Sequence, residues 1–243
     1  MRLFDTHCHF ESEEPSEIAA ILSRARAAGV EKLMAVGGSD ALNRTAALAG
    51  EQGCLVAQGF DRDQVGKPHD RAAIPDAGLA AWGEIGLDYH YAPETRAEQR
   101  TLFGEELEEA RRRGLPVVIP TREAAADTIA ILKEIPSRGI IHCFTGDPDE
   151  ARAYLDLGFY ISISGIVTFR AADNVRASAL VIPDDRILIE TDSPFLAPVP
   201  MRGNPNEPAF ICHTCEFLAK LRGMTAEDFA ERTFANAERI LGR

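Results

Sequence analysis

The segment Arg2-Leu-Phe-Asp-Thr-His-Cys-His9 decides the fold prediction for this chain. Its apolar start predicts one buried strand, and residues two apart on a strand project from the same face. His7 and His9 can therefore direct two imidazoles to one point, while Cys8 faces the opposite way. The pair lies at the C-terminal end of the strand, where parallel α/β proteins place their chemistry. By itself, this pair of histidines favours a metal site only modestly over a chance occurrence. The residues at the ends of the later strands are needed to distinguish the two.

Seven further short apolar segments follow, and most are separated by stretches with helical periodicity. They cover residues 32–36, 55–59, 79–84, 115–119, 139–143, 159–163 and 186–190. Helices are expected over 15–28, 41–51, 94–113, 124–134, 209–222 and 225–241. Prolines between 194 and 208 predict an extended loop after the eighth strand. This alternation predicts an α/β fold, a closed parallel (β/α)8 barrel formed as a single domain over residues 1–243, with a doubly wound open sheet as the alternative.

Charge and composition narrow the classes of function. The 26 Lys and Arg residues against 38 Asp and Glu residues give a net charge of −12. This charge disfavours a surface that holds nucleic acid by bulk electrostatics, although a small basic or metal-lined cleft stays possible. Neither a membrane span nor a signal peptide is evident, so we expect a cytoplasmic protein with no membrane and no obligate protein partner. Cys212-His-Thr-Cys215 is a single Cys-x-x-Cys, which we interpret as structural rather than metal-binding or redox-active.

Polar residues follow several of the predicted strands. The first strand ends in His7 and His9, the fourth in Glu84 and the sixth in His142, and Asp192 follows the eighth. Each has an ordinary explanation by itself, such as a loop cap, a buried hydrogen-bonded histidine or an N-cap. In a barrel, however, all five converge on one mouth. Imidazole and carboxylate ligands together suit zinc, manganese or iron better than calcium, so the pattern predicts a metal centre.

Five motifs resemble the TatD-like metal-dependent deoxyribonucleases of the amidohydrolase superfamily. They are Phe4-Asp-Thr-His-Cys-His9, Gly83-Glu-Ile-Gly-Leu-Asp-Tyr89, Leu115-Pro-Val-Val-Ile119 with Thr121-Arg-Glu123, His142-Cys-Phe-Thr-Gly146 and Glu190-Thr-Asp-Ser-Pro194. The resemblance extends over almost the whole chain. It implies a distorted (β/α)8 TIM-like barrel that holds one to three divalent metals such as zinc, manganese or magnesium.

The resemblance also implies ligand roles. His7, His9, Glu84 and Asp192 would hold the first metal, Glu84 would bridge to a second, and His142 would supply half of that second site. Where the family usually has another histidine, this chain has Pro120, which has no ligating side chain. We therefore expect a firmly held first metal and a weak or empty second site.

Two more departures from the family replace an imidazole. Gly59-Phe-Asp-Arg62 stands where the family has Gly-Ile-His-Pro, and Pro200-Met-Arg-Gly203 stands where it has Pro-His-Arg-Gly. Asp61 could still bind a metal, whereas Met201 could bind only a soft one. Thr121 or a water near Pro120 would replace an imidazole poorly.

The function expected from these features is divalent-metal-dependent hydrolysis of a phosphodiester, with DNA ends or a small phosphodiester as substrate. A metal can activate water by lowering its pKa. Asp192 is the expected proton acceptor and Glu84 the second catalytic carboxylate. Arg122 and Arg202 are candidates for phosphate contact because a guanidinium can bind two oxygens at once.

Two alternatives stay open at the level of sequence. A single-metal hydrolase of an amide, ester or lactone needs only one ion and fits the missing histidine better. A non-catalytic barrel that kept metal binding would show no turnover, and retention of all four residues of the first site argues against it. Metal stoichiometry and a substrate panel distinguish the three.

Overall fold

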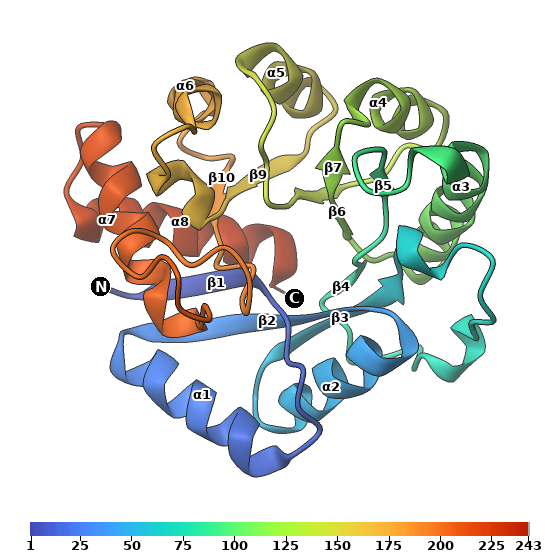
Figure 1. Cartoon of the computed structure of the whole chain (residues 1–243), viewed down its shortest axis with the longest axis horizontal. Coiled ribbons are helices and arrows are strands. Elements are labelled where there is room, and N and C mark those ends of the chain that lie inside the picture. The colour runs from blue at the N-terminus through green and yellow to red at the C-terminus, as the bar shows by residue number, and fades with distance from the viewer. Residues whose placement is uncertain (243) are drawn as a thin grey trace.

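The computed structural model describes residues 1–242 as a ring of parallel strands surrounded by helices (Figure 1). The strands of the ring are β1 (Leu3–Cys8), β2 (Val30–Gly38), β3 (Leu55–Phe60), β4 (Ala81–Gly83), β6 (Val117–Ile119), β8 (Gly139–Ile141), β9 (Tyr160–Ile163) and β10 (Ile187–Ile189). They pair in parallel and in chain order. The predicted (β/α)8 barrel is confirmed, and the open-sheet alternative is wrong. The end of the predicted domain, residue 243, lies outside the described residues.

The ring closes between β1 and β10 through contacts at and beyond the strand ends. The Asp192 backbone N–H donates to the His7 carbonyl at 2.9 Å, and the His9 N–H donates to the Ser193 carbonyl at 2.8 Å. Lower in the barrel, the Thr6 hydroxyl donates to the Ile189 carbonyl at 3.0 Å. The irregular closure explains why the barrel is distorted, and it places the segments that carry His7, His9 and Asp192 side by side.

Helices cover the outside of the ring (Figure 1). They are α1 (Pro15–Ala27), α2 (Asp40–Glu51), α3 (Arg96–Arg113), α4 (Ala125–Glu134), α5 (Pro148–Asp156), α6 (Asp173–Val181), α7 (Ile211–Leu221) and α8 (Ala226–Leu241). Side-chain caps fix several starts: Ser39 accepts from the Leu42 N–H, Asp147 caps α5, and Thr225 caps α8. The sequence prediction placed six of these helices and specified neither α5 nor α6. Within residues 1–242, no helix combines the length and apolarity needed to cross a bilayer.

Two apolar layers fill the molecule. Side chains that point into the barrel include Phe4, Met34, Val118 and Leu188, and helix α8 covers this interior, with the Phe234 ring 5.6 Å from that of Phe4. The second layer lies between strands and outer helices. It contains the fully buried Trp82, whose indole N–H donates to Glu106 of α3 at 2.8 Å. Helix α8 thus covers this end of the barrel, and a hollow of about 330 Å³ beside it is lined by residues that include Phe4, Leu79 and Leu241.

Short elements shape the mouth. Strands β5 (Leu87–Asp88) and β7 (Thr121–Arg122) form a parallel two-stranded ladder that the sequence analysis did not predict. Single-turn 3-10 helices are η1 (Arg62–Gln64), η2 (Arg71–Ala73), η3 (Pro93–Thr95), η4 (Gly165–Thr168) and η5 (Pro208–Phe210). The segment between β10 and η5 contains neither helix nor strand, as its prolines predict. These connections bring Arg62, Asp88 and Arg122 to the strand ends.

Candidate metal centre

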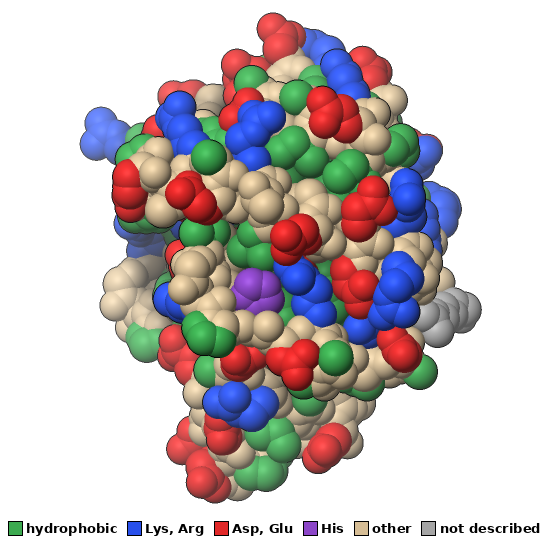
Figure 2. Space-filling model, turned by 90° about the vertical axis from the view of Figure 1, so that its right-hand side faces the viewer, with side chains coloured by type: hydrophobic (Ala, Val, Ile, Leu, Met, Phe, Trp, Pro, Cys, Tyr) green, Lys and Arg blue, Asp and Glu red, His purple; other side chains and the backbone are tan. Residues whose placement is uncertain are grey.

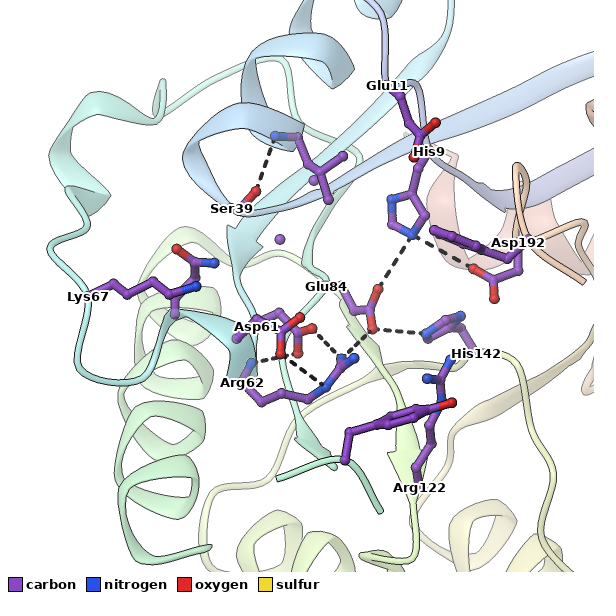
Figure 3. A pocket seen from close by; sticks show the side chains of 17 residues that line it. His9, Glu11, Ser39, Asp61, Arg62, Lys67, Glu84, Arg122, His142 and Asp192 are labelled. Atoms are coloured by element: carbon purple, nitrogen blue, oxygen red, sulfur yellow. Dashed lines mark hydrogen bonds and ion pairs between the residues drawn. The ribbon is translucent and has the colours of Figure 1, made fainter. Parts of the chain in front are cut away.

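Four predicted ligands meet at the mouth of the barrel. The Nε2 atoms of His7 and His9 lie 3.1 Å apart. Glu84 Oε2 is 3.6 Å from Nε2 of His7 and 3.7 Å from Nε2 of His9. Asp192 Oδ1 is 3.7 Å from both nitrogens. Figure 3 shows His9, Glu84 and Asp192 converging on one point.

These distances match the ligand shell of one small divalent ion. A tetrahedral ion with ligand bonds of about 2.1 Å holds its ligand atoms about 3.4 Å apart. The two nitrogens lie 3.1 Å apart, and each lies 3.6 to 3.7 Å from an oxygen of Glu84 and of Asp192, which is close to that value. Potential ligand atoms within 4.8 Å of one another form two groups that share His7: His7, His9 and Glu84, and His7, His142 and Asp192. Two imidazoles and two carboxylates also form a donor set that zinc, manganese and iron accept. The residues therefore fit a resident divalent metal.

Backbone contacts orient the ligands. His9 Nδ1 lies 2.8 Å from the Val36 carbonyl, so this nitrogen carries the proton and Nε2 presents its lone pair to an ion. Asp192 has a φ of 56°, a left-handed conformation that a β-branched residue would resist. His7 is fully buried, and its Nδ1 has no hydrogen-bond partner among the described residues. The quartet is held in place by the strands before any ion binds.

His142 lies against the quartet on one side. Its ring stacks on that of His7 with centroids 3.8 Å apart and an interplanar angle of 8°. Its Nε2 is 3.3 Å from Glu84 Oε1, and its Nδ1 is 3.3 Å from Glu190 Oε1. Glu190 in turn accepts the Cys143 backbone N–H at 2.6 Å. His142 thus faces the oxygen of Glu84 that points away from the two histidines.

Burial and charge shift the protonation equilibria of the site. Burial lowers the pKa of His7 well below its usual range, and the neighbouring His142 and His9 lower it further. Burial opposes charge on His142 as well, but the carboxylates of Glu84 and Glu190 outweigh it and raise its pKa. Burial raises the pKa of Asp192 to about 6. Burial would raise the pKa of Glu84 too, yet His142, His7 and Arg62 hold it well below its usual range.

Arg62 enters the site from the end of β3. Asp61 caps helix η1, and its carboxylate is in close contact with the Arg62 guanidinium. The same guanidinium places Nη1 3.4 Å from Glu84 Oε1 and Nε 3.3 Å from Asp88 Oδ2. Sequence analysis considered Asp61 as a possible metal ligand, whereas in the structure its carboxylate pairs with Arg62. Figure 3 shows this arrangement beneath Glu84.

A cavity of about 520 Å³ opens above the quartet. Its lining includes His9, Asp192, three cationic side chains and two aromatic rings, namely Arg62, Lys67, Arg122, Tyr91 and Phe195. Tyr91 and Phe195 are 70% and 55% exposed, so their faces are available to a ligand. A second hollow of about 400 Å³ shares Tyr91, Arg122, Asp192 and Phe195 with the first, which makes the two adjoin. The result is an extended groove with the metal centre on its floor.

The two predicted phosphate-binding arginines lie in different surroundings. Arg122 lines both hollows, and its guanidinium is 5.7 Å from the Tyr91 ring centroid. Arg202 stacks on Phe169 at 3.8 Å and is absent from the lining of either hollow. Met201, beside it, also lies outside both linings. Of the two, only Arg122 is placed to reach a ligand at the metal centre.

Pro120, the position at which the motif resemblance led us to expect a missing histidine ligand, is buried directly after β6. Its ring packs so closely on Gly86 that a Cβ added there would lie 2.7 Å from Pro120 Cδ. This part of the mouth is filled by carbon and offers no side-chain ligand. Thr121, next in sequence, belongs to the β5–β7 ladder.

Several site residues were not singled out by sequence analysis. Arg62, Lys67, Tyr91 and Phe195 all lie in loops or single-turn helices, where charged and aromatic residues ordinarily face solvent. Asp88 was quoted only as part of a motif. The position of Asp88 could have indicated that it belongs to the site. It is an acidic residue four positions beyond Glu84, after a buried strand, and such a residue lies near the same mouth of the barrel.

Comparison with known proteins agrees with this geometry. The family model described as TatD related DNase matches residues 4–242. The uncharacterized metal-dependent hydrolase YcfH of Escherichia coli K12 is 40% identical, over 99% of this chain and 96% of the relative. The protein named 3'-5' ssDNA/RNA exonuclease TatD from Cronobacter sakazakii is 34% identical, over 90% of each. The crystal structure of YJJV, a TatD homolog from Escherichia coli K12, superposes with a TM-score of 0.90 at 28% identity, covering 100% of this chain and 98% of that one.

The match over nearly the whole chain, together with the two-histidine, two-carboxylate centre at the barrel mouth, identifies the family predicted from the motifs. The chain belongs to the TatD-related DNase family and is a metal-dependent hydrolase of the TatD type.

Proposed function

We propose that this protein is a metal-dependent phosphodiesterase that acts on the ends of single-stranded DNA or on small phosphodiesters. The single observation that carries the proposal is the composition of the groove. A four-ligand metal centre lies beside three cations and two exposed aromatic rings, in a chain whose net charge is −12.

The charge distribution supports a locally held anionic substrate. Figure 2 shows acidic and basic side chains intermingled over one face of the molecule. Arg62, Lys67 and Arg122 line the same groove, together with five carboxylates (Glu11, Asp61, Asp63, Glu84 and Asp192). Arg62 is paired with Asp61, Glu84 and Asp88, so Lys67 and Arg122 are the cations of the lining that we assign to a phosphate. Long duplex DNA needs a broad basic surface, whereas one or a few phosphates need only a few well-placed cations. Tyr91 and Phe195 can each stack on a base, which is how single strands are held without sequence preference.

The chemistry requires a nucleophile, a proton acceptor and charge neutralisation. A divalent ion held by His7, His9, Glu84 and Asp192 would supply water of lowered pKa and would polarise the phosphoryl oxygen. Asp192 Oδ1 lies 3.7 Å from Nε2 of both histidines, and we assign this carboxylate as the proton acceptor. Arg122 is placed to neutralise a phosphate oxygen. Glu84 would bind the ion through Oε2, which faces His7, and its Oε1 lies 3.4 Å from the Arg62 guanidinium.

The activity is tested by reconstitution. The protein is stripped with a chelator, reloaded separately with zinc, manganese and magnesium, and assayed on end-labelled single-stranded DNA and on bis(p-nitrophenyl) phosphate. Cleavage that starts at one end and disappears in Asp192→Asn is expected. A folded protein that cleaves neither substrate with any of the three metals would remove the phosphodiesterase proposal.

A second candidate function has one specific observation in its favour. Pro120 removes a ligand that a two-metal phosphodiesterase would use, and a hydrolase that attacks an amide, ester or lactone carbon needs only one ion. The arginines weigh against it, since a neutral carbonyl substrate needs no cluster of cations. Hydrolysis of lactones or amides by the loaded protein, with no action on DNA, would establish the carbon-centre hydrolase instead.

A further inference from the structure

Arg62 is a buried cation with three carboxylate neighbours. Its side chain is 12% exposed, and it contacts Asp61, Glu84 and Asp88, which are themselves buried. A buried charge is tolerated only where opposite charges and hydrogen bonds compensate its desolvation. An arginine guanidinium stays protonated in proteins, so Arg62 is a permanent positive charge on the floor of the groove.

Glu84 is shared between the metal quartet and Arg62. Its Oε2 lies 3.6 Å from His7 Nε2 on the quartet side. Its Oε1 lies 3.4 Å from Arg62 Nη1 and 3.3 Å from His142 Nε2 on the other side. In two-metal hydrolases the ions lie about 3.5–4 Å apart, so a carboxylate that bridges them places one oxygen on each. Here the second oxygen faces a guanidinium.

The remaining surroundings of Oε1 do not fit a second ion. The carboxylates of Asp61 and Asp88, which could otherwise join Glu84 and His142 around an ion, both lie against Arg62. A divalent cation placed beside Glu84 Oε1 would also be repelled by the adjacent guanidinium, and repulsion is strong where water is excluded. His142 by itself supplies only one further ligand atom, and its Nδ1 faces Glu190 at 3.3 Å.

We infer that the Arg62 guanidinium takes the place of the second metal ion, so that the chain binds one divalent ion and supplies the other positive charge from its own sequence. The inference rests on the proposed function only through the ion held by the quartet, and it concerns metal count rather than substrate. The metal centre then binds a single ion because Arg62 occupies the place of the second. The carboxylates that would otherwise attract a second ion are already neutralised by Arg62.

The test is a metal count on the full chain. The protein and three variants are saturated with Mn²⁺ and desalted, and bound manganese is measured by elemental analysis, with isothermal titration and electron paramagnetic resonance on the same samples. Arg62→Met removes the charge and keeps the length of the side chain, whereas Arg62→Lys keeps a charge. Arg122→Met is the matched control, because Arg122 lines the same groove and faces the same Asp88 carboxylate at 3.8 Å.

The expected result is one manganese per chain for the unaltered protein, Arg62→Lys and Arg122→Met, and two for Arg62→Met, whose spectrum gains the exchange-coupled signal of a pair. Circular dichroism establishes that each variant is folded. Two ions in the unaltered protein would overturn the inference even if Arg62→Met does not fold, and so would a folded Arg62→Met that still binds one. DNA cleavage is scored separately: absence of cleavage with one ion bound removes the nuclease proposal and leaves this inference standing.

Discussion

Asp5 and Thr191 join the first and last strands of the barrel immediately beside the metal ligands. The backbone N–H of Thr191 donates to Asp5 Oδ1 at 2.9 Å, and its hydroxyl donates to Asp5 Oδ2 at 2.5 Å. The N–H of His7 also approaches Oδ1 at 3.3 Å. One buried carboxyl group therefore fixes the backbone on both sides of the quartet, since His7 and Asp192 are near or next to it in sequence.

Replacing Asp5 tests this positioning role. Burial raises the pKa of Asp5 to about 8, and Asn keeps one of the two oxygens that accept these hydrogen bonds. Asp5→Ala leaves buried N–H groups without a partner, each at a cost of about 1–3 kcal/mol. It should also weaken metal affinity by about 10-fold to 100-fold, as loss of a group that orients ligands does. Urea unfolding and metal titration measure both. Equal damage from Asp5→Asn would show that charge, not hydrogen bonding, matters.

Metal binding should stabilise the fold. An ion that binds only the native state at about 100 times its Kd adds about 2.7 kcal/mol, which raises the Tm of a chain this size by roughly 5–10 °C. Asp192→Asn, which alters one of the four ligands, should lose most of this shift. Asp185→Asn, an exposed carboxylate paired with Arg186, serves as the control and should keep it. Thermal unfolding with and without Mn²⁺ decides the matter, and a full shift in Asp192→Asn would contradict the assigned ligand set.

The exposed ring of Phe195 should strengthen the binding of a single-stranded DNA substrate. Phe195 lies at the junction of the two hollows and is 55% exposed, so its ring can stack on a base. Stacking contributes about 1–3 kcal/mol per base, which predicts a rise of about 5-fold to 100-fold in KM for single-stranded DNA in Phe195→Ala. Activity on bis(p-nitrophenyl) phosphate should change far less. Leu180→Ala, an equally exposed apolar residue on α6, is the control. An unchanged KM for DNA would exclude stacking on Phe195.

Glu109, on helix α3, should make the free energy of unfolding depend on pH in the acid range. Its carboxylate accepts from Arg112 at 2.7 Å and from Arg113 at 2.7 Å, and these arginines lower its pKa from 4.5 to about 2. Because the pKa is lower in the folded state, the contribution is complete above pH 4.5 and is lost as the pH falls from about 4.5 to about 2. The unfolding free energy of the unaltered protein should exceed that of Glu109→Gln at pH 6, and the difference should shrink toward pH 2.

Glu108→Gln is the matched control for this pH dependence. Glu108 lies on the same helix, is half exposed, and pairs with Arg111 at 3.1 Å. Exposed pairs contribute little, so this variant should follow the unaltered protein at every pH. A pH profile for Glu109→Gln that runs parallel to the unaltered protein would show that the arginine pair does not couple to folding.

The barrel and the convergence of its candidate metal ligands could be predicted because both depend on local pattern. Short apolar segments mark the strands, and polar residues directly after a buried strand must lie at one mouth once the strands are parallel. His7, Glu84 and Asp192 meet as expected for this reason. Pro120 was also singled out from the motifs, and both its place as the substitute for a histidine and its effect on metal number stay predictions.

Other features depend on contacts between distant residues. Arg62 follows a strand and would ordinarily face solvent; its partners Glu84 and Asp88 are 22 and 26 positions away. The β5–β7 ladder contains two residues in each strand, too few for any periodicity to appear. The exposed rings of Tyr91 and Phe195 lie in irregular loops, where sequence gives no direction to a side chain.

The position of α8 has a consequence for how the protein is made. The ring of Phe4 packs against that of Phe234, which is synthesised 230 positions later. The inner layer of the barrel therefore remains incomplete, and the apolar strand β1 lacks this cover, until α8 has been synthesised. Such late, long-range closure slows folding and makes the unfinished polypeptide a natural client for chaperones.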